Sequence, residues 1–150
     1  MLSRFIYLAS TAQPPLSPQK MVAHLGNALN VPAPNRLQYG TPSDFNFYTR
    51  GEFYTRGENG LHWSPLNGEF SLSCDLNLQG IELPALLTRL QNMSMDGFRI
   101  ALPDNTATLP DTYLLFDQGA VFAQQGELDE NAGVLHLIGT PKPTPSKAPA

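Results

Sequence analysis

Residues 69–102 read EFSLSCDLNLQGIELPALLTRLQNMSMDGFRIAL and contain the three clearest periodic patterns of the chain, one after another. From 69 to 79, apolar and polar residues alternate without interruption, which is typical of a strand with one buried face. The period then changes to that of an amphipathic helix, whose apolar stripe consists of Leu83, Leu86, Leu87, Leu90 and Met93. Residues 98–102 alternate again. The stretch therefore predicts a strand, a helix and a second strand.

Proline, glycine and serine mark the ends of the predicted helices. Pro84 suits a first helical turn, because its φ is fixed and the N–H that it lacks would have no partner there. The pair Asp96-Gly97 predicts the end of that helix. Ser17 before Pro18 has the pattern of an N-cap, and the apolar stripe that follows predicts another helix as far as about Asn30.

Short alternating segments predict the other strands, at 2–9, 112–116, 120–124 and 134–138. Two Asn-Gly pairs, at 59–60 and 67–68, predict hairpin turns that join three strands into a meander. Residues 31–44 are rich in proline and are left as a connection without assigned structure.

The turn at Asn67-Gly68 also predicts a register. If two residues form the turn, Trp63 lies opposite Leu72, and Leu61 lies opposite Cys74. Both pairs are apolar, so the register agrees with one buried face. At the other turn, the hydrophobic pattern favours a three-residue loop at 58–60 with a G1 bulge.

A tandem repeat precedes this meander: FYTRGE occurs at 47–52 and again at 53–58. An extended chain would place the tyrosines, arginines and glutamates of both copies on one face, whereas a turn at Arg50-Gly51 would fold the copies onto each other. Tyrosine and arginine are enriched at protein interfaces. We therefore expect four of these residues to contribute to a partner-binding surface: Tyr48, Arg50, Tyr54 and Arg56.

These elements predict the α+β class. We expect one domain at 1–139, with a mostly antiparallel, twisted sheet of about six or seven strands and two helices packed on one face. The alternation of the meander strands predicts that their other face is in contact with water. Residues 140–150, TPKPTPSKAPA, contain four prolines and predict a disordered or polyproline II tail.

The charge distribution favours a basic partner. The formal net charge is −4, and no lysine or arginine occurs between Arg99 and Lys142, an interval that contains six acidic residues. Such an interval produces a negative field, which repels nucleic acid and attracts a basic protein, although solubility alone could also explain it. Within it, the predicted partner-binding residues are Asp117, Glu127, Asp129 and Glu130; the other two acids are Asp104 and Asp111.

No motif predicts a metal site, a cofactor or nucleic-acid binding. His24, His62 and His136 are far apart in the sequence and have no second ligand at metal-binding spacing. The glycines at 51, 57, 60 and 68 occur singly in turns, without the helix N-terminus of a phosphate loop. The predicted register would bring His62 close to Ser73 and Asp75. These types suit a hydrolase, but an open sheet face offers no oxyanion hole, so we expect a solvated polar face.

The compartment is predicted by cysteine content and hydropathy. Cys74 is the single cysteine, so an intramolecular disulfide is impossible and a reducing cytoplasm is favoured. The apolar run at 5–9 is too short for the core of a signal peptide. No apolar run approaches the length of a membrane span. We therefore expect a cytoplasmic protein without membrane contact.

These observations favour a non-enzymatic protein-binding module that neutralises or occludes a basic protein, as immunity proteins and phage-encoded inhibitors do. An alternative is an accessory or structural subunit of a larger assembly, in which the tail and the repeat would dock on neighbours. A homo-oligomer is left open. The hydrolase hypothesis is the least favoured.

Overall fold

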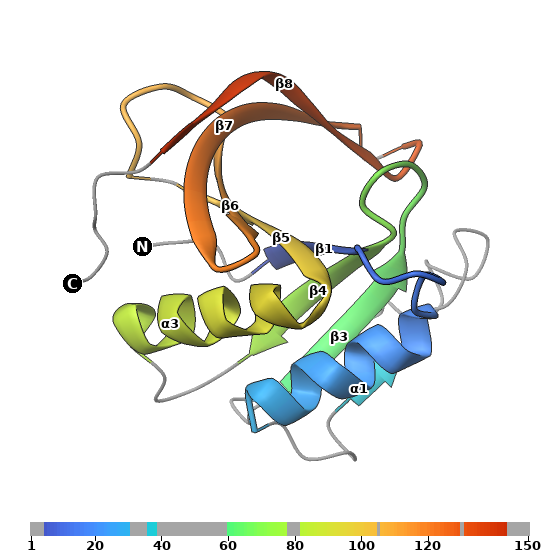
Figure 1. Ribbon diagram of the computed structural model, residues 1–150. Coiled ribbons are helices and arrows are strands. Elements are labelled where there is room, and N and C mark those ends of the chain that lie inside the picture. Colours follow the sequence, from blue (N-terminus) through green and yellow to red (C-terminus); the bar gives the residue numbers. More distant parts are fainter. Residues whose placement is uncertain are drawn as a thin grey trace.

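The computed structural model describes residues 5–30, 36–38, 60–77, 82–104, 106–129 and 131–143 (Figure 1). In chain order, the elements are β1 (Phe5–Ser10), α1 (Pro18–Ala28), β2 (Arg36–Gln38), β3 (Gly60–Pro65), β4 (Leu72–Asn77), α3 (Leu83–Met93), the 3₁₀ helix η2 (Ser94–Asp96), β5 (Phe98–Pro103), β6 (Thr112–Asp117), β7 (Ala120–Asp129) and β8 (Val134–Pro143). The strands form one sheet in the order β2-β3-β4-β1-β5-β6-β7-β8.

The predicted α+β class and the mostly antiparallel sheet are confirmed. Neighbouring strands are antiparallel except β2 and β3, which run parallel. The described residues form eight strands rather than six or seven. The short β2 was not predicted, because its three residues are too few to show a period and lie in the proline-rich stretch at 31–44.

The two helices pack on one face of the sheet, as predicted (Figure 1). In α1, the Ser17 side chain accepts a hydrogen bond from the Lys20 N–H at 3.3 Å, which confirms the N-cap. The bounds of α3 agree with its apolar stripe, although Leu83 is 38% exposed. The core on this side consists of Ile6, Leu8, Met21, Val22, Leu25, Leu29, Leu72, Cys74, Leu76, Leu90, Met93, Phe98, Ile100, Leu102 and Phe116.

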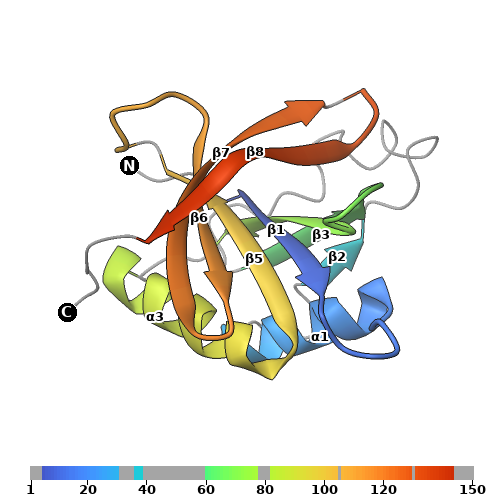
Figure 2. The same cartoon turned by 45° about the horizontal axis from the view of Figure 1, so that its top comes forward.

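The opposite face of β1, β5 and β6 is also covered, which was not predicted. The water-exposed face was predicted for the meander strands, and on β4 the side chains of that face, Ser73 and Asp75, are partly buried. On the covered face, β7 and β8 fold back over β1, β5 and β6 (Figure 2). They enclose a second apolar cluster made of Tyr7, Ala9, Phe70, Ala101, Tyr113, Leu115 and Leu135. Alternation in one strand could not show this, because tyrosine and alanine on its second face do not distinguish burial from exposure.

The hairpin between β3 and β4 is longer than predicted. Leu66 donates its N–H to the Ser71 carbonyl at 2.9 Å, so the loop spans 67–70 rather than two residues. Trp63 consequently pairs with Cys74 instead of Leu72. A shift of two residues preserves which face each side chain occupies. Phe70, however, leaves the strand and enters the second cluster, away from Leu72.

The structure describes part of the predicted tail but none of the tandem repeat. β8 continues to Pro143, so the first four residues assigned to a disordered tail form part of a strand. Pairing of Phe122 with Pro143 and of Ala123 with Lys142 shows why: this end of β8 follows the long β7. Residues 144–150, the tandem repeat at 47–58 and most of the loop at 58–60 lie outside the described residues.

Phe70→Ala tests whether the second cluster contributes to stability. Phe70 is fully buried although it lies in a loop, so its truncation should lower the free energy of unfolding by about 3–5 kcal/mol. Urea unfolding measures this. Phe5→Ala is the matched control, because Phe5 is exposed and its truncation should cost less than about 1 kcal/mol. Equal effects of the two substitutions would contradict the assignment of a core to this face.

Candidate functional site

The structure separates Asp117 from Glu127 and Asp129, which the sequence grouped with it. Asp117 pairs with Ala120 where β7 begins, and Asp129 pairs with Val134 where β7 ends. Nine residue steps lie between these ends, which is about 30 Å of strand. Asp117 is therefore at the opposite end of β7 from Asp129, whereas Glu127 and Asp129 lie on the same exposed face of this strand. Five predicted residues lie outside the described part of the chain: Tyr48, Arg50, Tyr54, Arg56 and Glu130.

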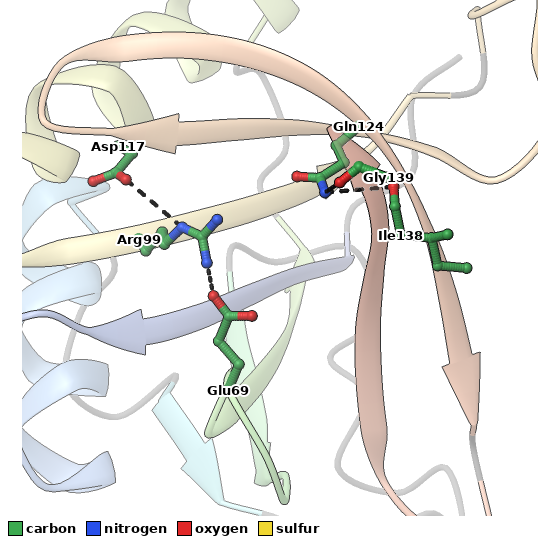
Figure 3. Close-up of polar contacts among 6 residues, drawn as sticks. All are labelled: Glu69, Arg99, Asp117, Gln124, Ile138 and Gly139. Carbon is green, nitrogen blue, oxygen red and sulfur yellow. Dashed lines mark hydrogen bonds and ion pairs between the residues drawn. The ribbon is translucent and has the colours of Figure 1, made fainter. Parts of the chain in front are cut away.

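Asp117 belongs to a charged cluster beside the second core (Figure 3). The Arg99 Nε lies 3.7 Å from Asp117 Oδ2, and Arg99 Nη1 pairs with Glu69 Oε2. The guanidinium also lies over the Phe70 ring, 5.8 Å from its centroid, and the Arg99 side chain is only 23% exposed. Arg99 thus links the loop before β4 to the end of β6. The cation beside Asp117 reduces the contribution of this carboxylate to an outward negative field.

Asp129 stabilises the turn between β7 and β8. Its Oδ1 accepts hydrogen bonds from the N–H groups of Asn131 and Ala132, both at 3.1 Å. Its carbonyl accepts the Gly133 N–H at 2.8 Å. An aspartate that bonds the backbone two and three residues ahead is a common turn-forming element. The carboxylate therefore has a structural role as well as its charge.

Glu127 lies on an exposed surface that also carries apolar side chains. Its cross-strand partner is His136, and the next pair on the same face is Gln125 and Ile138. Gln125 Nε2 donates to the Pro110 carbonyl at 3.1 Å, which links this face to the loop before β6, in which Leu109 is the preceding residue. Ile138 and Leu109 are 52% and 55% exposed. We call this set the outer hairpin surface: Leu109, Gln125, Glu127, His136 and Ile138.

The outer hairpin surface was only partly predictable. Glu127 was predicted from charge, whereas Leu109, Gln125, His136 and Ile138 were not. The alternation in 134–138 carries a usable signal, since it places His136 and Ile138 on one face of a strand. The position of Leu109 depends on how the loop before β6 folds. That folding is fixed by contacts such as the bond from Gly126 N–H to the Asp111 carbonyl at 2.9 Å.

The loop between β3 and β4 is hydrogen-bonded to the turn of this hairpin. Asn67 donates its backbone N–H to the Gly133 carbonyl at 2.8 Å, and its Nδ2 donates to the Ala132 carbonyl at 3.0 Å. These two bonds hold the turn between β7 and β8 against the opposite half of the sheet. The outer hairpin surface is thus presented on a hairpin that is fixed at its turn.

The predicted Ser/His/Asp arrangement changes with the register. His62 lies opposite Asp75, and Ser73 lies opposite Ser64 rather than His62. The expected pairing of His62 with Ser73 was wrong by two residues, because the hairpin loop is longer. Ser73 and Asp75 are partly buried. The side chains of His62 and Ser64 are outside the described part of the structure.

Two further groups have altered acidities. Burial, with a smaller effect of Asp75, raises the pKa of the Cys74 thiol far above its usual value, so this cysteine stays protonated and unreactive. Burial, followed by the charge of Asp111, raises the pKa of Tyr113. Among the described residues, no group of three or more His, Cys, Asp or Glu could hold a metal ion. None of the described helices is long and apolar enough to cross a membrane.

Asp129→Ala and Glu127→Ala should differ in their effect on the free energy of unfolding. Loss of two backbone hydrogen bonds in Asp129→Ala should cost about 1–2 kcal/mol of unfolding free energy. Glu127→Ala removes an exposed side chain without a described structural bond and should change stability by less than about 0.5 kcal/mol. Thermal and urea unfolding measure both. A Glu127→Ala variant as destabilised as Asp129→Ala would show that Glu127 is a structural residue.

No family model matches the sequence, and neither a curated protein nor a solved structure matches the chain. Function must therefore be inferred from the side chains that the fold exposes. The outer hairpin surface is the strongest candidate, because it combines exposed apolar side chains with an anionic group on a fixed hairpin.

Proposed function

We propose that the chain is a non-enzymatic module that binds and occludes a basic protein through the outer hairpin surface. The proposal places the chain in the class of immunity proteins and phage-encoded inhibitors. The observation that carries it is the position of Glu127 between the exposed Ile138 and the turn at the end of the hairpin. Apolar contact area with a charged rim is the usual composition of a protein interface.

The apolar side chains and the carboxylate have different parts in the proposed complex. Ile138 and Leu109 supply the area that is removed from water when the partner binds. Glu127 orients the partner and accelerates association, because an exposed charge acts mainly on the encounter rate. The association rate should consequently fall as salt is added.

The experiment compares three tagged proteins in capture from a lysate of the source cells: the wild type, Glu127→Lys and Glu82→Lys. Glu82 is a matched control, because it is exposed and precedes α3 in the helical layer. The wild type and Glu82→Lys should retain the same basic protein at low salt. Glu127→Lys should bind it about fivefold more weakly, since an exposed ion pair contributes up to about 1 kcal/mol.

Asp129→Lys is unsuitable for this experiment, because it would also remove the turn bonds. Near-ultraviolet circular dichroism should show that all three tested proteins are folded. Equal capture by Glu127→Lys and the wild type, or capture of no basic protein at low salt, would overturn the proposal.

A further inference from the structure

Within the part of the chain that the structure describes, the last strand of the sheet has one unpaired edge. β8 ends the strand order, and the described residues provide no hydrogen-bond partners for the outer edge of its residues 134–138. Figure 2 shows β8 at this end of the sheet. Unpaired N–H and C=O groups on such an edge can accept another strand.

The second half of β8 is protected from strand addition and the first half is not. Pro141 and Pro143 lack N–H groups, and Gly139 has a positive φ of 78° that interrupts the extended backbone. Prolines and irregularities are common ways to block an edge. Residues 134–138 read VLHLI and have none of these features. Among the described residues, the part of the edge without these blocking features therefore spans 134–138.

An irregularity between β7 and β8 separates the two halves. Gln125 pairs with Ile138, but Ala123 pairs with Lys142, so three residues of β8 lie opposite Gln124 alone. Gln124 is only 8% exposed, and its Nε2 donates to the Gly139 carbonyl at 2.8 Å and to the Ile138 carbonyl at 3.4 Å (Figure 3). These bonds stabilise the irregularity, so 134–138 remain a separate, regularly paired segment.

We propose that 134–138 bind an extended segment of the partner as a ninth strand. The inference rests on the proposed function and names its binding mode. On the outer face, an added strand would place one side chain beside His136 and another, two residues away, beside Ile138. An apolar residue fits beside Ile138. A lysine or arginine fits beside His136, since Glu127 lies two strand spacings, about 9.6 Å, from the added strand.

The partner segment is therefore extended and carries a basic and an apolar residue two positions apart. Backbone hydrogen bonds to 134–138 supply affinity, and the outer hairpin surface supplies specificity. The negative charge of Glu127 is complementary to the basic residue of this segment. An acidic segment would instead place like charges together, which disfavours its binding.

The probe is the peptide Thr-Lys-Thr-Val-Thr-Lys-Thr-Val-Thr, titrated into the full chain and followed by amide NMR. We expect binding, with amide exchange slowed within 134–138. An analogue with N-methylated backbone amides should bind at least about tenfold more weakly, because several hydrogen bonds are lost. A peptide with glutamate in place of both lysines should bind the wild-type protein more weakly by a similar factor. The original peptide should bind Glu127→Lys about fivefold more weakly than the wild type, and it should bind Glu82→Lys as well as the wild type.

Two results would overturn the inference. One is the absence of peptide binding. The other is that the N-methylated peptide binds as tightly as the original peptide and amide exchange in 134–138 is not slowed. This result would indicate binding through side chains alone and would not contradict the proposed function. Failure of the proposed function is a separate result, namely equal capture of the basic protein by the wild type and Glu127→Lys.

Discussion

The burial of β1 on both faces is the constraint on which the rest of the structure depends. Ile6 and Leu8 face the helices, whereas Tyr7 and Ala9 face the second cluster, and none of the four is more than 6% exposed. β1 is also paired on both edges, with β4 and β5. A strand enclosed in this way requires a cover on each side of the sheet. The helices provide one cover, and the curled β7 and β8 provide the other.

This arrangement determines which surfaces are left for a partner. Because β7 and β8 bury one face against the second cluster, their other face is turned outward. The hairpin is held at its turn by Asn67 and Asp129, and Gln124 stabilises the irregularity farther along. Since the sheet does not close, β8 has no strand on its outer edge among the residues that the structure describes. The exposed side chains and the open edge are thus consequences of the same folding back of the sheet.

Much of the fold could be predicted from local patterns, and the exceptions have physical causes. Both helices were predicted, because each has a long apolar stripe and a proline in its first turn. Phe70 was assigned to the wrong face, because alternation does not reveal where a strand ends and its loop begins. The two-residue turn was wrong because the loop is also bonded to Ala132 and Gly133, contacts that are distant in the sequence. The cover on the second face depends on the same kind of contact.

The candidate site was less predictable than the fold. Sequence shows that Asp117, Glu127 and Asp129 are acidic, but only the structure distinguishes an ion pair, an exposed carboxylate and a turn-forming acceptor. The apolar part of the surface joins a loop residue to an edge-strand residue, Leu109 and Ile138. Neither residue is unusual in the sequence, and the pairing of β6, β7 and β8 places their segments on either side of β7.

Site-specific photo-crosslinking tests the central claim most directly. A benzophenone amino acid is placed at Ile138, on the outer hairpin surface, and in a second protein at Leu83, an exposed apolar residue at the start of α3. Our account predicts that position 138 becomes linked to one basic protein in the source lysate, that high salt suppresses the link, and that position 83 does not form it. A link from position 83 alone would contradict the account. Links from both positions that do not depend on salt would also contradict it, and would instead indicate a subunit of a larger assembly.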